Sequence, residues 1–127
     1  MTPVALVMLR LALPLLLLAA PVQAHEIEAG NGVICDTREQ AQRLAVLLDD
    51  DAQAAIRTVN AEADDATDCA LASVTYVRGV KAGTARSKAG TFEIFEVLVV
   101  GVETRRGLQQ ASPAVYFTLF KVEERPA

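Results

Sequence analysis

The segment between residues 37 and 63 has the hydrophobic pattern of helices. Apolar residues recur every three or four positions over residues 41–48 and again over residues 52–63, which is the period of an amphipathic helix. We predict one helix over residues 37–48, and a second that the three aspartates at 49–51 cap. Two pairs have the spacing of a capping box for the first helix: Asp36 with Glu39, and Thr37 with Gln40. The pattern leaves open whether these are two separate helices or one bent helix.

In the second half of the chain the pattern changes to the alternation of β-strands. Residues 70–81 alternate apolar and polar side chains and are rich in β-branched residues, so they are predicted to form a strand. Residues 91–104 carry apolar side chains on both faces, and we expect the middle of this strand to be covered from two sides. The last strand is predicted over residues 113–123. Gly83 and Gly90 bracket a short basic segment, which is interpreted as a hairpin that turns at Gly83 and adds a small strand.

Together these elements predict an α+β domain. Two N-terminal helices are expected to pack on one face of a three- or four-stranded antiparallel sheet, because short connections join neighbouring strands in antiparallel order. Residues 25–32 are polar and are predicted to form a flexible entry, and residues 33–35 are too few to predict more than an extended lead-in. The chain has 127 residues, which is room for one domain.

The first 24 residues have the layout of a signal peptide. Residues 11–20 are apolar, and compact residues precede a predicted cleavage site between Ala24 and His25. An uncleaved membrane anchor is the alternative, but ten uninterrupted apolar residues fall short of the roughly twenty that span a bilayer. We therefore expect residues 1–24 to be removed and residues 25–127 to form a single exported domain that is not attached to a membrane.

Cys35 and Cys69 are the only cysteines, and two cysteines behind a signal peptide are expected to form one disulfide. A zinc site is the alternative, but it would need four ligands, and His25 is the only histidine. Closing a loop of about 35 residues is worth roughly 3–4 kcal/mol if the disulfide acts through loop entropy. Such a link is useful here, because aromatic residues make up only 5% of the chain and tryptophan is absent.

The distribution of charge argues against nucleic-acid binding. The net charge is −4 for the whole chain and −5 without residues 1–24, because that segment holds one basic residue and no acidic one. Residues 36–68 carry nine acidic side chains, whereas residues 78–88 carry four basic ones and no acid. The four basic residues are Arg78, Lys81, Arg86 and Lys88. If the hairpin brings them together, they would bind an anionic partner; alternatively, they protect a sheet edge against aggregation.

No catalytic motif stands out in the sequence, and no cofactor is predicted. His25 is expected at the mature terminus, so a nucleophile activated by histidine is not predicted. Cleavage before His25 would place an α-amine and an imidazole on one residue, a weak copper site. Aspartates at helix ends and in loops could form a catalytic carboxylate pair or a calcium site, although EF-hand spacing is missing. These aspartates are Asp49, Asp50, Asp51, Asp64, Asp65 and Asp68.

Several short motifs resemble those of small exported bacterial proteins of uncharacterised function. The likeness covers most of the mature chain and rests on Val33-Ile34-Cys35-Asp36-Thr37, residues 51–55, Cys69 and residues 99–103. The resemblance implies a periplasmic or secreted setting and supplies no activity. We expect a non-enzymatic module that binds a protein or an anionic partner through its sheet edge or the basic hairpin, with a small carboxylate-dependent enzyme as the alternative. The oligomeric state is left open.

Overall fold

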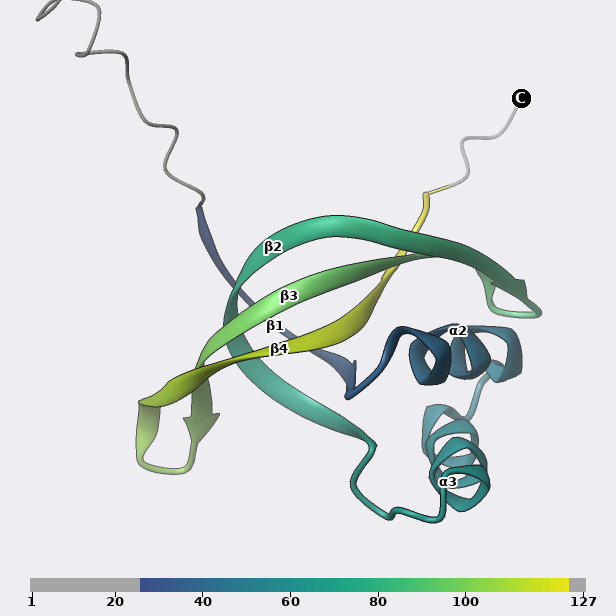
Figure 1. The fold of residues 1–127 in the computed structure, drawn as a ribbon, viewed down its shortest axis with the longest axis horizontal. Coiled ribbons are helices and arrows are strands. Elements are labelled where there is room, and N and C mark those ends of the chain that lie inside the picture. The colour runs from purple at the N-terminus through teal and green to yellow at the C-terminus, as the bar shows by residue number, and fades with distance from the viewer. Residues whose placement is uncertain (1–25, 124–127) are drawn as a thin grey trace, which may run out of the picture.

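A computed structural model describes residues 26–123, and a strand is the first element in this part of the chain (Figure 1). Two helices follow that strand, and three long strands come after them. The elements are β1 (Ile27–Cys35), α2 (Arg38–Leu47), α3 (Ala52–Glu62), β2 (Cys69–Ser87), β3 (Gly90–Thr104) and β4 (Gly107–Lys121). The predicted signal peptide, including its cleavage site at His25, lies outside the described residues.

Polar residues before each helix explain where the helices begin. The Thr37 hydroxyl accepts a hydrogen bond from the backbone N–H of Gln40, and the Gln40 side chain accepts one from the N–H of Thr37, both at 3.2 Å. Asp51 caps α3 by accepting from the N–H of Ala54 at 3.1 Å. The prediction of helices in this segment is confirmed, and the structure resolves the open alternatives: the helices are separate, and Thr37 with Gln40 forms the capping box.

The four strands pair in antiparallel order and close into a small barrel, β1-β2-β3-β4. β2 pairs with β1 over residues 69–77 and with β3 over residues 74–87, and β3 continues into a long hairpin with β4. Only two residue pairs close the barrel between β1 and β4: Ile34 with Thr118, and Cys35 with Phe117. Over the rest of its length β1 has no strand partner on the β4 side within the described chain.

The expected fold class is wrong in two respects. The helices are not N-terminal, because residues 27–35 form β1 and place both helices between the first and second strands. The sheet is also not an open layer, because β1 closes it against β4. The sequence did not reveal β1, because Gly30 and Gly32 stand where a strand normally carries apolar side chains toward a core.

The predicted hairpin at Gly83 is wrong as well. β2 runs through Gly83, which lies opposite Ile94 of β3 next to an irregularity in the strand register. Such a bulge bends a strand without ending it. The chain turns instead at residues 88–89, and Gly90 follows with φ at 129°, a conformation that residues with a Cβ rarely adopt.

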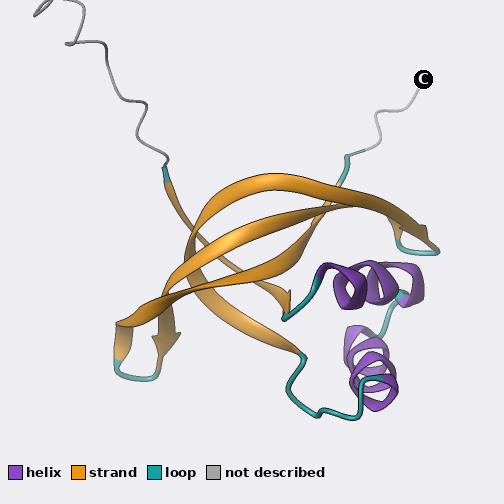
Figure 2. Cartoon of the chain, in the orientation of Figure 1, coloured by secondary structure: helices purple, strands orange, loops and turns teal. Residues whose placement is uncertain are grey.

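Two apolar clusters hold the fold together. Figure 2 shows both helices next to one end of the strands. The first lies between the helices and the outer face of the sheet, and it includes Leu44 of α2 and Ile94 of β3, both fully buried. The second lies inside the barrel and is built from Val74, Tyr76, Val97 and Val99. The helices therefore cover one end of the barrel wall, while the interior of the barrel has a small core of its own.

The middle of β3 is covered on one face only. Val97 and Val99 are buried inside the barrel, but Leu98 on the opposite face remains 37% exposed. The prediction that the middle of this strand is covered on both faces is therefore only partly fulfilled at Leu98. Leu98 belongs to a row of apolar cross-strand neighbours on the outer face, made of Ile27, Val77, Leu98 and Val115.

The predicted disulfide between Cys35 and Cys69 is confirmed. The two residues lie opposite each other on β1 and β2, with 2.06 Å between their sulfur atoms, and both are buried. Asn60 of α3 fixes the same corner of the fold. Its amide nitrogen donates to the carbonyls of Ala66 and Cys69 at 3.0 Å, and its oxygen accepts from the N–H of Cys69 at 2.8 Å.

A buried disulfide is compatible with an extracellular or periplasmic location. No helix within residues 26–123 is long and apolar enough to cross a membrane.

Candidate functional site

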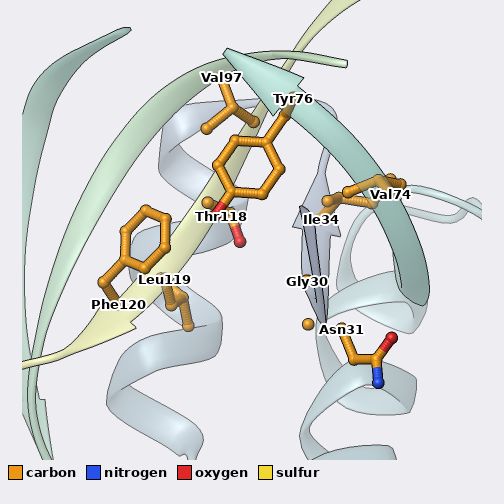
Figure 3. A pocket seen from close by; sticks show the side chains of 10 residues that line it. Gly30, Asn31, Ile34, Val74, Tyr76, Val97, Thr118, Leu119 and Phe120 are labelled. Atoms are coloured by element: carbon orange, nitrogen blue, oxygen red, sulfur yellow. The ribbon is translucent and has the colours of Figure 1, made fainter. Parts of the chain in front are cut away.

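A cavity lies inside the barrel, between β1, β2 and β4 (Figure 3). Its volume is about 100 Å³. Branched and aromatic side chains form most of its wall: Ile34, Val74, Tyr76, Val97, Leu119 and Phe120. The rings of Tyr76 and Phe120 reach this space from different strands, with 6.3 Å between their centroids. A cavity of about 150 Å³ accommodates a benzene ring, so this one has room for a compact group of about four to six carbons.

Two glycines of β1 leave one side of the cavity without side chains. Gly30 and Gly32 alternate with Glu28 and Ile34 along the face of β1 that looks into the barrel. A Cβ at Gly30 would meet no atom within 4 Å, and one at Gly32 would meet only the Thr118 hydroxyl at 3.9 Å. Side chains therefore fit at both positions, and the fold does not require glycine there for steric reasons. Glycine within a strand often marks the close approach of a ligand.

The cavity reaches the surface along the seam between β1 and β4. The ladder between these strands ends after two residue pairs, and there the hydroxyl of Thr118 donates to the Val33 carbonyl at 2.7 Å. This side-chain bond satisfies a carbonyl at the end of the ladder. Gly30 and Asn31 lie beyond it and are exposed, so the seam is the entrance to the barrel.

Arg78, one of the predicted anion-binding residues, lies beside this cavity. Its guanidinium carbon is 3.8 Å from the ring centroid of Phe120 and 5.3 Å from that of Phe95. Its Nε and Nη2 donate to the carboxylate of Glu28 at 3.0 and 2.7 Å. These hydrogen bonds raise the pKa of Arg78 against the opposing effect of desolvation. The site therefore joins a fixed cation to an apolar cavity.

The other three predicted cations lie further along β2 and do not meet at Arg78. Lys81 pairs with Glu93 of β3, with 2.9 Å between Nζ and Oε2. Arg86, near the end of β2, is also engaged in a side-chain or backbone interaction. Lys88 is exposed in the turn after β2. Lys88 is ten positions after Arg78, which corresponds to about 30 Å along a straight strand. In this half of β2 the strand pairs with β3 alone, so protection of a sheet edge stays a prediction for these cations.

Two of the candidate acids, Asp65 and Asp68, interact directly in the loop between α3 and β2. Desolvation and a hydrogen bond with Asp65 raise the pKa of Asp68, whereas hydrogen bonds from Thr67 lower the pKa of Asp65. The amide of Gln40 also donates to Asp68 at 2.5 Å. The loop therefore shifts the two carboxyl groups in opposite directions, with the pKa of Asp68 raised and that of Asp65 lowered. The pair lies outside the barrel, and the cavity wall contains no acidic side chain.

Replacing Asp68 with asparagine is expected to raise the melting temperature at pH 7 and to leave it unchanged at pH 3. Asparagine keeps the shape and hydrogen-bonding groups of a protonated carboxyl. Because the pKa of Asp68 is raised in the folded state, its protonated form stabilises the fold at low pH, and this contribution is lost as the pH rises through that pKa. Thermal unfolding at pH 3 and pH 7 should show the gain at pH 7 alone. Asp64→Asn, an exposed neighbour outside the pair, is the control; an equal gain at both pH values would contradict this explanation.

The described residues do not assemble the metal sites considered from the sequence. Between residues 26 and 123, no group of three or more histidine, cysteine, aspartate or glutamate side chains could hold a metal ion. Both cysteines are joined in the disulfide and are not available to zinc. His25, the copper candidate, lies outside the described part of the chain.

Sequence reasoning found Arg78 but missed the residues that surround it. Glu28 is fifty positions away on β1, and Phe120 is on β4, so only the closure of the barrel brings them together. The available signal was the pair Gly30 and Gly32, two glycines close together in a short polar segment. Comparisons with protein-family models, with curated proteins and with solved structures gave no match to this chain.

Proposed function

We propose that this is a non-enzymatic binding protein whose barrel cavity takes one compact apolar group of its ligand. The observation that carries the proposal is a cavity of about 100 Å³ inside the barrel. Protein interiors are normally filled to crystal-like density, whereas this space stays open although apolar side chains form most of its wall. Since side chains fit at Gly30 and Gly32, a sequence under selection for stability alone would fill the space.

Export is part of the same proposal, and it is supported by two features. The disulfide between Cys35 and Cys69 is a link that persists in oxidising compartments. Residues 1–24 have the layout of a secretory signal. Both features fit a bacterial periplasmic or secreted protein that meets its ligand outside the cytosol.

The Gly32→Val variant tests the proposal, because it is expected to abolish binding and to raise stability together. A neutral compact probe, 4-methylpentanamide, should bind the wild type with a Kd on the order of 1 mM and shift the NMR signals of Tyr76 and Val97. Valine fills part of the cavity and suits a strand, so the free energy of unfolding should rise by about 1 kcal/mol while the probe-induced shifts disappear.

Ala29→Val is the matched control for this experiment. Ala29 is exposed on the opposite face of the same strand, so its variant adds an identical side chain away from the cavity and should bind the probe like the wild type. If the wild type shows no shifts, or if both variants respond equally, the cavity is not the binding site.

A further inference from the structure

We infer that the ligand of the barrel cavity is an organic anion, a carboxylate on a compact apolar group, and that Arg78 binds the carboxylate. The inference rests on the proposed function and adds the chemical class of the ligand. A group of about four to six carbons would occupy the cavity, and the carboxylate would lie at its mouth.

The guanidinium of Arg78 lies next to aromatic residues that also line the cavity. Phe120 lines the cavity, and the centroid of its ring lies 3.8 Å from the guanidinium carbon. Tyr76 also lines the cavity, and its ring centroid is 6.3 Å from that of Phe120. A ligand whose apolar end contacts these two rings therefore has its other end beside the positive charge. A planar guanidinium stacked on a ring is also held in one orientation, which favours binding of a planar carboxylate.

Glu28 shows how a carboxylate binds at this position. Its two oxygens accept from Nε and Nη2 of Arg78 in a side-by-side arrangement. The guanidinium has five N–H groups, and Glu28 uses two of them. The side chains are 38% and 33% exposed for Arg78 and Glu28 respectively, so water and solutes reach the pair. A ligand carboxylate can therefore take the place of Glu28 on the same two donors.

The two partners differ in how firmly they are held. Arg78 is held by the rings of Phe120 and Phe95 as well as by Glu28. Among the hydrogen bonds found in residues 26–123, those to the Glu28 carboxylate come from Arg78 alone. When a ligand carboxylate replaces that of Glu28, the Glu28 side chain would therefore move and the Arg78 side chain would stay in place. Arg78 is the residue that binds the ligand.

A second ion pair, Arg43 with Glu62, shows what distinguishes this site. It has the same two-bond geometry, at 3.1 and 3.0 Å, but it joins two helices on the outer surface. Neither residue lines the barrel cavity. Its carboxylate can be neutralised in the same way, which makes Glu62→Gln a matched control for Glu28→Gln.

The test compares two probes of equal shape, 4-methylpentanoate and 4-methylpentanamide, by NMR titration at pH 7 and low salt. The acid should bind the wild type about tenfold more tightly than the amide, since hydrogen bonds to charged groups are the stronger ones. Glu28→Gln should tighten binding of the acid by a further factor of about three or more, because the competing carboxylate loses its charge. Binding of the amide should stay unchanged, and Glu62→Gln should alter neither probe.

The outcomes separate this inference from the proposed function. Equal affinity for acid and amide in both the wild type and Glu28→Gln overturns the inference and leaves the cavity as a binding site. If neither probe binds, both proposals fall. Tighter binding of 4-methylpentylamine than of the acid would also overturn the inference, since it would assign the receptor role to Glu28. N-acetylleucine, which mimics a peptide C-terminus, identifies the source: binding as tight as that of the simple acid points to a peptide end, and weaker binding points to a free organic acid.

Discussion

Replacing Cys35 and Cys69 together with alanine is expected to lower the melting temperature by roughly 15–30 °C while leaving the folded barrel unchanged. The disulfide closes a loop with a sequence separation of 34, which contains both helices. Loop entropy at that length amounts to about 4 kcal/mol. Domains of this size are stable by only about 5–15 kcal/mol, so the loss is a large fraction of the total.

The position of the disulfide explains why the fold should survive its loss. The bond joins β1 to β2, and these two strands pair over residues 27–35 and 69–77. Their hydrogen-bonded ladder remains when the covalent link is removed. We therefore expect the double variant to form the same barrel and to unfold at a lower temperature.

The measurement is thermal unfolding followed by circular dichroism, with and without a reducing agent. The reducing agent should lower the melting temperature of the wild type toward that of the double variant and should leave the double variant itself unaffected. Equal melting temperatures for the oxidised wild type and the double variant would show that the disulfide contributes nothing to stability.

The helices could be predicted from the sequence because the signals that define them are local. The spacing of apolar residues and the caps at Thr37 and Asp51 all lie within a few positions of the helix that they specify. The strand over residues 91–104 was predicted nearly to its ends for a similar reason, because its apolar run is long and a turn follows it at once. The disulfide followed from the cysteine count.

The barrel could not be predicted, because its closure depends on contacts between segments far apart in the chain. β1 meets β4 through residues more than eighty positions apart, and no local pattern encodes that pairing. β1 itself lacks the expected alternation, since Gly30 and Gly32 border a cavity instead of a packed core. Gly83 was misleading for the opposite reason: a glycine that suggests a turn lies instead in a bulged strand.

The candidate site, too, could be predicted from the sequence only in part. The charge pattern singled out Arg78 among four cations, but it gave no reason to prefer Arg78 over Lys88. The difference comes from the fold, because an interior-facing position next to Tyr76 places Arg78 over Phe120 and within reach of Glu28. The charge pattern alone predicts that a cation is present, while the strand register determines which cation lies beside the cavity.

Truncating Leu44 to alanine is expected to destabilise the protein by about 3 kcal/mol and to lower the melting temperature by roughly 12–24 °C. Leu44 is fully buried in the cluster that joins α2 to the sheet, together with Ile94 of β3. Removing three carbons there leaves a cavity between two rigid layers that cannot close around it. Val46→Ala on the same helix is the control: Val46 is half exposed, and its truncation should cost less than about 0.5 kcal/mol.

The Leu44→Ala variant also tests whether the helices and the barrel unfold as one unit. Because Phe92 and Ile94 of β3 belong to the same buried cluster as Leu44 and Val59, a loss of packing on the helix side weakens the barrel wall directly. The helical signal at 222 nm and the tyrosine signal, which includes that of Tyr76 inside the barrel, should therefore fall in a single transition at the lower temperature. A helical signal that melts before the tyrosine signal would show that the inserted helices are a separate unit, and that the cavity of the barrel is stable without them.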